Sequence, residues 1–181
     1  MTTELNSVQN AQRDMRVAYA NGSTGLIASG LVWIIAGIVA CYSMPIHAVL
    51  ALFIGGMFIF PLSIGICKLM KCSGNHSKDN PLGSLALEVT FMMLVCLPIA
   101  YVVFTHTAEW FFPTMMLVIG ARYLTFSTLY GLRTYWLCGG ALIASGFALV
   151  ALKAPFITGA FVGGGLELLF AAFIYPQKRH D

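Results

Sequence analysis

Three ionisable residues lie inside apolar segments of this sequence: Glu88, Arg122 and Glu167. Each costs about 2.5–3.5 kcal/mol in the middle of a membrane, so charges at such positions usually pair or serve a function. With a rise of about 1.5 Å per residue, all three lie about 9–14 Å from the same membrane surface. A guanidinium keeps its proton, so two carboxylates beside one arginine leave one carboxylate that must bind a proton or a cation. The three residues therefore predict a buried site for a proton, an ion or a small solute.

Two hydroxyl side chains accompany these charges. Ser84 lies one helical turn before Glu88, and Thr125 shares a polar stripe with Arg122. Both are candidate ligand-binding residues of the same site. A structural alternative is an interhelical salt bridge that only fixes packing, with the second glutamate reaching water at the interface.

A second polar group is predicted on the opposite membrane face. His47 begins one apolar segment, and His106 and Glu109 follow another. Two imidazoles and one carboxylate could bind Zn²⁺ with one coordination position open for hydrolytic chemistry. The alternative is three ordinary interfacial residues beside aromatic side chains. The five cysteines have no paired metal-ligand spacing, and nucleotide and nucleic-acid motifs are absent from the sequence, so we expect no cofactor and no nucleic-acid partner.

The elements that must position these residues follow from the composition. The chain has 181 residues, of which 59% are hydrophobic and 9% charged, which excludes a soluble globular domain. Continuous apolar runs of about 20 residues are typical of transmembrane helices and not of barrel strands. We therefore expect an all-α polytopic membrane protein with six transmembrane helices, arranged as three antiparallel hairpins because the links are short. The predicted spans are residues 24–43, 46–67, 82–104, 111–131, 136–152 and 156–175.

The domain organisation is simple. Residues 1–23 are expected to form a cytoplasmic segment with a short amphipathic helix, residues 24–175 one six-helix transmembrane domain, and residues 176–181 a cytoplasmic tail. Eight basic residues flank the spans on the side of the N-terminus, and only Lys153 flanks them on the other. This asymmetry predicts that both termini are cytoplasmic and that the protein lies in the plasma (inner) membrane. Near the cytoplasmic ends of the spans, an interfacial aromatic belt is expected from Tyr123, Tyr130, Tyr135 and Trp136.

An internal repeat is also predicted. The pentapeptide at 26–30 recurs at 142–146, and the Phe-Ile-Gly-Gly at 53–56 resembles the Phe-Val-Gly-Gly at 161–164. The unit that carries Gly30, residues 36–40 and Pro45 before residues 53–56 resembles the hairpin unit of the HdeD-type six-span membrane proteins. The resemblance covers residues 24–67 well and residues 136–175 partly, and the middle hairpin with Glu88 and Arg122 departs from it. It implies a chain made entirely of three hairpins, in a family with some members linked to acid resistance.

Three functions are compatible with these residues. The first is a membrane protein that moves or binds a proton, ion or small solute through the Glu/Arg cluster. The second is a non-transporting membrane stress or assembly protein, and the third is a membrane enzyme that uses the outer His/Glu group. Six short spans leave little room for a large substrate, which favours a small ligand or a homo-oligomer with a shared site. The expected partners are therefore the lipid bilayer, a small ion or solute, and a second copy of the chain.

Overall fold

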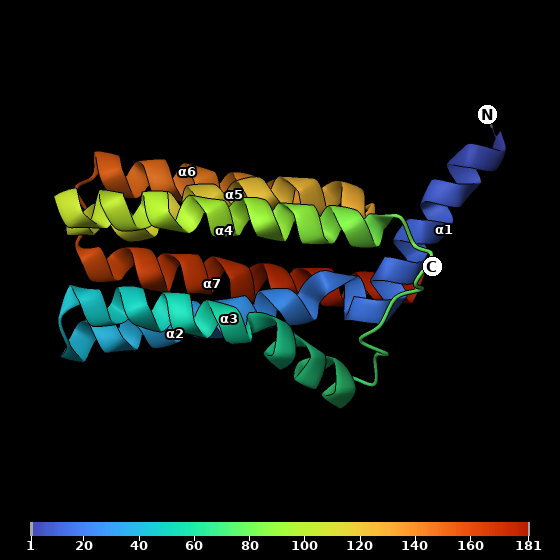
Figure 1. The fold of residues 1–181 in the computed structure, drawn as a ribbon, viewed down its shortest axis with the longest axis horizontal. Helices are drawn as coiled ribbons and strands as arrows, with labels where there is room; N and C mark the ends of the chain where they lie inside the picture. The colour runs from blue at the N-terminus through green and yellow to red at the C-terminus, as the bar shows by residue number, and fades with distance from the viewer. Residues whose placement is uncertain (1, 181) are drawn as a thin grey trace.

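The chain folds into a bundle of long helices with one further helix at its end. The computed structural model describes residues 2–180, with side chains described for residues 7–177. Helices α2–α7 run along one axis, except for the last turns of α3, which bend away from the bundle (Figure 1). Helix α1 projects from the end at which both termini lie, which we call the α1 end. The expectation of an all-helical fold is confirmed. The elements are α1 (Thr2–Tyr19), η1 (Ala20–Gly22), α2 (Ser23–Tyr42), α3 (Pro45–Leu69), α4 (Leu82–His106), η2 (Ala108–Trp110), α5 (Phe111–Tyr130), α6 (Thr134–Ala151), α7 (Phe156–Ile174) and η3 (Tyr175–His180).

Five stretches of the described residues are long and apolar enough to cross a membrane: Ser7–Tyr42, which joins α1 to α2, then α3, α4, α6, and Phe156–Gln177, which extends α7. Helix α5 is not among them, and it carries Arg122 and several hydroxyl residues. Large apolar side chains also cover the outside of the bundle: Phe58 on α3 and Phe91 on α4 are 61% and 66% exposed. Such an apolar outer surface suits lipid and would be unusual in water.

Helix boundaries follow familiar local rules. Pro45 lies in the first turn of α3 and Pro155 directly precedes α7, positions at which a missing backbone N–H costs nothing. Helix α5 ends at Gly131, which has a φ of 67° in the left-handed region that favours glycine. These breaks turn the chain back within a few residues and keep successive helices of the bundle antiparallel.

The junction between α1 and α2 is a buried left-handed turn. Ala20, Asn21 and Gly22 have φ values of 49°, 61° and 80° and are buried. The side-chain amide of Asn21 donates to the Ile174 carbonyl oxygen at 3.1 Å, and the Tyr135 hydroxyl donates to the Asn21 carbonyl oxygen at 2.7 Å. The turn is therefore held by residues of α6 and α7 and fixes where α1 leaves the bundle.

Two pairs of helices cross with their backbones in contact. Helix α2 packs on α7, where a Cβ added at Gly164 would lie 2.9 Å from the Gly30 carbonyl oxygen. Helix α5 packs on α6, where a Cβ at Gly139 would lie 2.5 Å from the Gly120 carbonyl oxygen. Small residues permit this approach in membrane bundles. Helix α2 also contacts α3, and α5 also contacts α4. Because α7 in turn contacts both α5 and α6, these two groups of three helices form one connected body. The division of the bundle into three hairpins stays a prediction.

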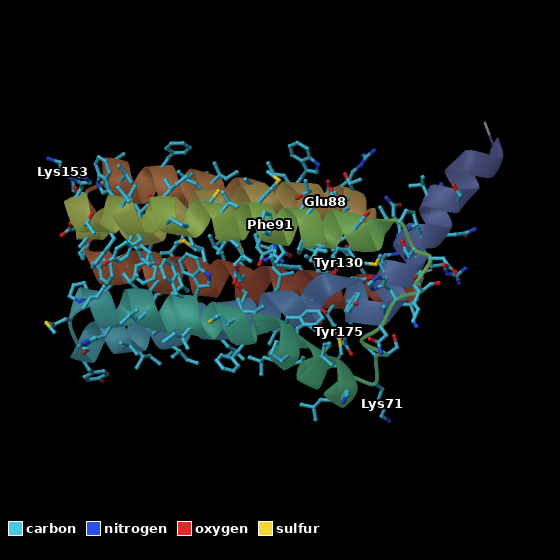
Figure 2. All side chains as sticks on the ribbon, viewed as in Figure 1. Lys71, Glu88, Phe91, Tyr130, Lys153 and Tyr175 are labelled. Atoms are coloured by element: carbon cyan, nitrogen blue, oxygen red, sulfur yellow. The ribbon has the colours of Figure 1, made fainter. Side chains whose placement is uncertain are left out.

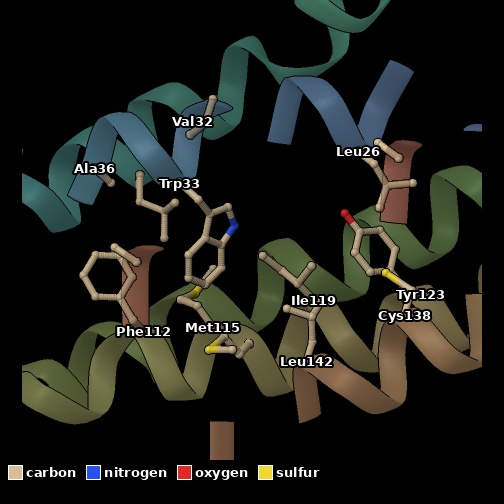
Figure 3. Packing of buried hydrophobic residues seen from close by; sticks show 14 of the residues in the cluster. Leu26, Val32, Trp33, Ala36, Phe112, Met115, Ile119, Tyr123, Cys138 and Leu142 are labelled. Carbon is tan, nitrogen blue, oxygen red and sulfur yellow. The ribbon is translucent and has the colours of Figure 1, made fainter. Parts of the chain in front are cut away.

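The core lies along the inner faces of α2, α5, α6 and α7. The Trp33 side chain of α2 is 1% exposed and reaches toward α5, where its ring centroid is 5.6 Å from that of Phe112 (Figure 3). The same ring lies against Gly163 of α7, since a Cβ there would come within 2.6 Å of it. The Trp33 ring therefore fills the centre of the bundle, and it fits there because Gly163 has no side chain.

The prediction of an interfacial aromatic belt is wrong for three of its four residues, because they are buried in the bundle. Tyr123, Tyr130 and Tyr135 are 3%, 6% and 0% exposed, whereas Trp136 is 59% exposed. The reason is helical periodicity: Tyr123 and Tyr130 are seven residues apart and share the face of α5 that turns into the bundle. The rings of Tyr130 and Tyr135 stack with centroids 5.4 Å apart, so these tyrosines form a core layer near the α1 end.

Candidate functional site

The most unusual residue of the core is Glu167 on α7. Its side chain is 0% exposed, and its Oε1 accepts a hydrogen bond from the Tyr123 hydroxyl of α5 at 2.7 Å. Its Oε2 is buried without a hydrogen-bond partner among the described residues. The Ser29 side chain of α2 lies close to the carboxyl group as well. Side chains of α2 and α5 thus lie against one carboxyl group of α7.

The glycines of α7 explain how a carboxyl group comes to lie so deep. Gly159, Gly163 and Gly164 precede Glu167 by eight, four and three residues, so all of them share one helix face. A Cβ on any of them would meet Phe112, Trp33 or Gly30, at distances of 2.6–2.9 Å. This face is therefore pressed against α2 and α5, and the next large side chain along it is enclosed.

Arg122 lies one residue before Tyr123 but points toward another helix. Successive side chains on a helix diverge by about 100°, so Tyr123 turns to α7 while Arg122 turns to α4. Its Nη2 donates to Thr90 Oγ1 at 3.0 Å and its Nη1 to Met93 Sδ at 3.5 Å. Its guanidinium carbon lies 5.0 Å from the ring centroid of Phe126, which is cation–π geometry.

No carboxylate forms an ion pair with Arg122 in the described part of the chain, and its Nε is buried without a hydrogen-bond partner there. It does interact electrostatically with Glu167 across the bundle. The arginine is thus a cation near the buried carboxyl group, and its direct contacts are uncharged.

Glu88 lies on the outer face of α4 (Figure 2). Its side chain is exposed and makes no ion pair or hydrogen bond with a described residue. The hydroxyls of Ser84 and Thr125 are also exposed and donate to the carbonyl oxygens of Pro81 and Arg122 in their own helical turns, at 2.7 and 2.6 Å. The structure therefore places Arg122 near Glu167 and leaves Glu88 on the outer surface of the bundle.

The outer polar group is not gathered into a metal centre. His47 and Ser43 share a short hydrogen bond, and His106 and Glu109 are exposed. No group of three His, Cys, Asp or Glu side chains in the described residues lies close enough to hold a metal ion. The structure therefore does not bring His47, His106 and Glu109 together as zinc ligands.

A polar network at the α1 end was not anticipated from the sequence. Oδ2 of Asp14 on α1 accepts the Ser77 backbone N–H at 2.9 Å and the Asn80 side-chain amide at 2.8 Å. The Tyr19 hydroxyl and His76 Nδ1 are 2.8 Å apart. These contacts fasten α1 to the 70–81 loop. The loop's dense run of Asn, Ser and Asp was the available signal, since such residues cap and bridge backbone groups.

The fold and the composition are those of a helical membrane protein, and among the described side chains the carboxyl group of Glu167 is enclosed in the core. The family of unknown function DUF7010 matches residues 8–177, and the chain belongs to this family. Comparison with curated proteins and comparison with solved structures each found no match.

Proposed function

We propose that the protein is an integral membrane protein that takes up and releases a proton at Glu167. The carrying observation is the complete enclosure of this carboxyl group with one oxygen unpartnered among the described residues. An ionised carboxylate in a dry interior costs several kcal/mol unless a cation or enough hydrogen-bond donors compensate it. The Tyr123 hydroxyl donates one hydrogen bond, the Ser29 hydroxyl lies close to the carboxyl group, and Arg122 acts only from a distance.

A proton suits this site better than a metal ion. Hard cations require about six oxygen ligands, and monovalent ions also need several. The groups close to Glu167 are two hydroxyls and the Cys138 thiol, with apolar side chains and glycines beyond them. A proton needs no set of surrounding ligands. The Tyr123 hydroxyl can donate to the ionised carboxylate and can rotate when the carboxyl group gains a proton.

The topology belongs to the same proposal. Helix α5 crosses the membrane with the other five because it packs along α6 and α4 within the bundle. Both termini are cytoplasmic in the plasma (inner) membrane, as the basic asymmetry predicts. The three-hairpin architecture of the HdeD-type proteins is the arrangement that we propose for the helices.

One observation favours a second function, a non-transporting assembly or stress protein. Glu167 lines neither the hollow of about 350 Å³ between α4 and α5 nor that of about 510 Å³ beside α1. The α2–α7 and α5–α6 pairs pack closely through glycines, and in this second function the Glu167 carboxyl group only helps to hold the helices together. Proton release must then be absent, which makes the two functions experimentally distinct.

The test uses the purified full chain in liposomes loaded with a pH-sensitive dye. We expect proton entry down an imposed gradient, lost in Glu167→Gln and slowed about tenfold in Tyr123→Phe, with Glu109→Gln as a matched control on the exposed loop. Infrared spectra should contain a protonated-carboxyl band that disappears only in Glu167→Gln. Wild-type chain that conducts no more than empty liposomes would contradict transport and leave the assembly function.

A further inference from the structure

Two opposite charges on the outer part of the bundle lack an oppositely charged partner in the described chain. Glu88 is exposed on α4, with neither ion pair nor hydrogen bond to a described residue. Arg122 of α5 has a hydroxyl, a thioether and an aromatic ring as its contacts. Charges within membrane helices are expensive when isolated, so each of them calls for a counter-charge.

Arg122 lines a hollow in the surface, and Glu88 lies one helical turn from one of the residues that line it. The groove between α4 and α5 has a volume of about 350 Å³ and is largely apolar, with Arg122 and Thr125 at its α1 end and Leu117 at its other end. Met92 lines it from α4. Glu88 precedes Met92 by one helical turn, so its side chain lies beside the rim of the groove.

The depths of the two charges match. Glu88 is six residues from the start of α4 and Arg122 eight from the end of α5, and both of these helix ends lie at the α1 end. These intervals correspond to about 9 Å and about 12 Å along the helix axes. Two copies inserted in the same orientation would therefore hold Glu88 of one and Arg122 of the other in one layer of the membrane.

We propose that a second copy of the chain packs its α4 into this groove, so that the partner subunit's Glu88 pairs with Arg122 and Glu88 pairs with the partner subunit's Arg122. Such a contact is isologous, with a two-fold axis along the membrane normal. The α4 surface is suited to it, because Phe91 and Val95, which follow Glu88 by three and seven residues on the same side of the helix, are 66% and 57% exposed. The pairing does not depend on Glu167 or on proton transfer.

Opposite charge reversals test the pairing. Chains labelled with donor or acceptor dyes are placed in liposomes, and energy transfer reports dimers. Glu88→Arg alone places two arginines together at both contacts, and Arg122→Glu alone places two glutamates together. We expect each variant to dimerise at least tenfold more weakly than the wild type. A mixture of the two variants should dimerise again, because both contacts then join opposite charges.

Other outcomes overturn the proposal. Dimers that persist in Glu88→Arg would exclude the pairing, as would a mixture that stays monomeric although both variants are folded by circular dichroism. If Arg122→Glu does not fold, Glu88→Gln decides, since its site is exposed: unchanged dimerisation contradicts the inference. A third outcome is a monomeric wild type that retains acidic phospholipid through purification. If Arg122→Gln loses this lipid and Glu88→Gln keeps it, the groove binds a lipid and the proposed dimer is excluded.

Discussion

At the scale of single residues, two carboxyl groups of this chain are accommodated in opposite ways. Asp14 lies near the surface and accepts two hydrogen bonds on one oxygen, from Asn80 and Ser77. Glu167 lies in the core and accepts one, from Tyr123. Donors lower the pKa of Asp14, with the Asn80 side-chain amide as the largest cause and the Ser77 N–H next. The first carboxylate is therefore suited to a permanent charge that fastens α1.

A pH dependence follows for the α1 contact. A carboxylate with a lowered pKa in the folded state stabilises that state above its ordinary pKa of 3.8, and the contribution is lost as the pH falls through the lowered value. We expect the Ser77 amide to be more strongly protected against hydrogen exchange, relative to the intrinsic rate at each pH, at neutral pH than in acid. Asp14→Asn should speed this exchange about fivefold at neutral pH, as for one lost hydrogen bond. Asp79→Asn, at an exposed residue of the same loop, is the control; equal exchange in both variants would refute the contact.

At the scale of helices, the bundle is organised around glycine crossings. The α2–α7 contact passes through Gly30 and Gly164, and the α5–α6 contact through Gly120 and Gly139. Neighbouring glycines offer a comparison, because a Cβ at Gly140 or Gly165 would meet nothing within 4 Å. The glycines in contact therefore serve close approach, and their neighbours face outward.

Adjacent substitutions on α6 should separate these two kinds of glycine. Gly139→Ala places a methyl group 2.5 Å from the Gly120 carbonyl oxygen, which is backbone and cannot rotate away. We expect it to destabilise the protein by about 1–3 kcal/mol, the usual cost of overpacking. Gly140→Ala should be neutral or stabilise by up to about 1 kcal/mol through helix propensity. Thermal unfolding in detergent measures both, and equal melting temperatures would mean that the crossing is looser than described.

The helices themselves are largely predictable from the sequence, and their contacts are not. The apolar segments predicted at 82–104 and 156–175 correspond to α4 (Leu82–His106) and α7 (Phe156–Ile174), since apolar length is a local property. The sequence predicts a buried site that includes Glu167, and the structure encloses this residue. For its partner Tyr123 the sequence predicts the membrane interface instead, because an amphipathic side chain suits either place and only the rotation of α5 decides between them. The exposure of Glu88 likewise depends on how α4 is rotated.

At the scale of the whole molecule, polar contacts are concentrated at one end. The α1 end holds the Asp14 network, the left-handed turn and the chain ends. It is also the end with most basic residues, which predicts that it faces the cytoplasm. The opposite end has short connections, such as residues 43–44 between α2 and α3. The polar contacts that fasten α1 to the rest of the chain thus lie at one end of the molecule.

Cysteine labelling from outside the cell tests this orientation. In a background with Cys41 and Cys72 replaced by serine, Thr107→Cys should react with a membrane-impermeant maleimide in intact cells. Asn75→Cys should react only after the membrane is permeabilised, because the 70–81 loop lies at the α1 end. A reversed pattern would mean that the protein is inserted in the opposite orientation. Labelling of both residues from outside would mean that α4, which lies between them, does not cross the membrane.

The left-handed turn at residues 20–22 imposes an order on biosynthesis. The residues that hold Asn21 are Tyr135 and Ile174, which lie 114 and 153 positions further along the chain. A ribosome therefore releases the first helices into the membrane long before their final contacts exist, and α2 must wait for α7. Until then the turn has no hydrogen bonds to these residues, and α1 is tethered only through the sites that emerge earlier, such as Ser77. The beginning of the chain is accordingly among the last parts to reach its folded position, and a ribosome stalled before residue 174 would leave it accessible to protease.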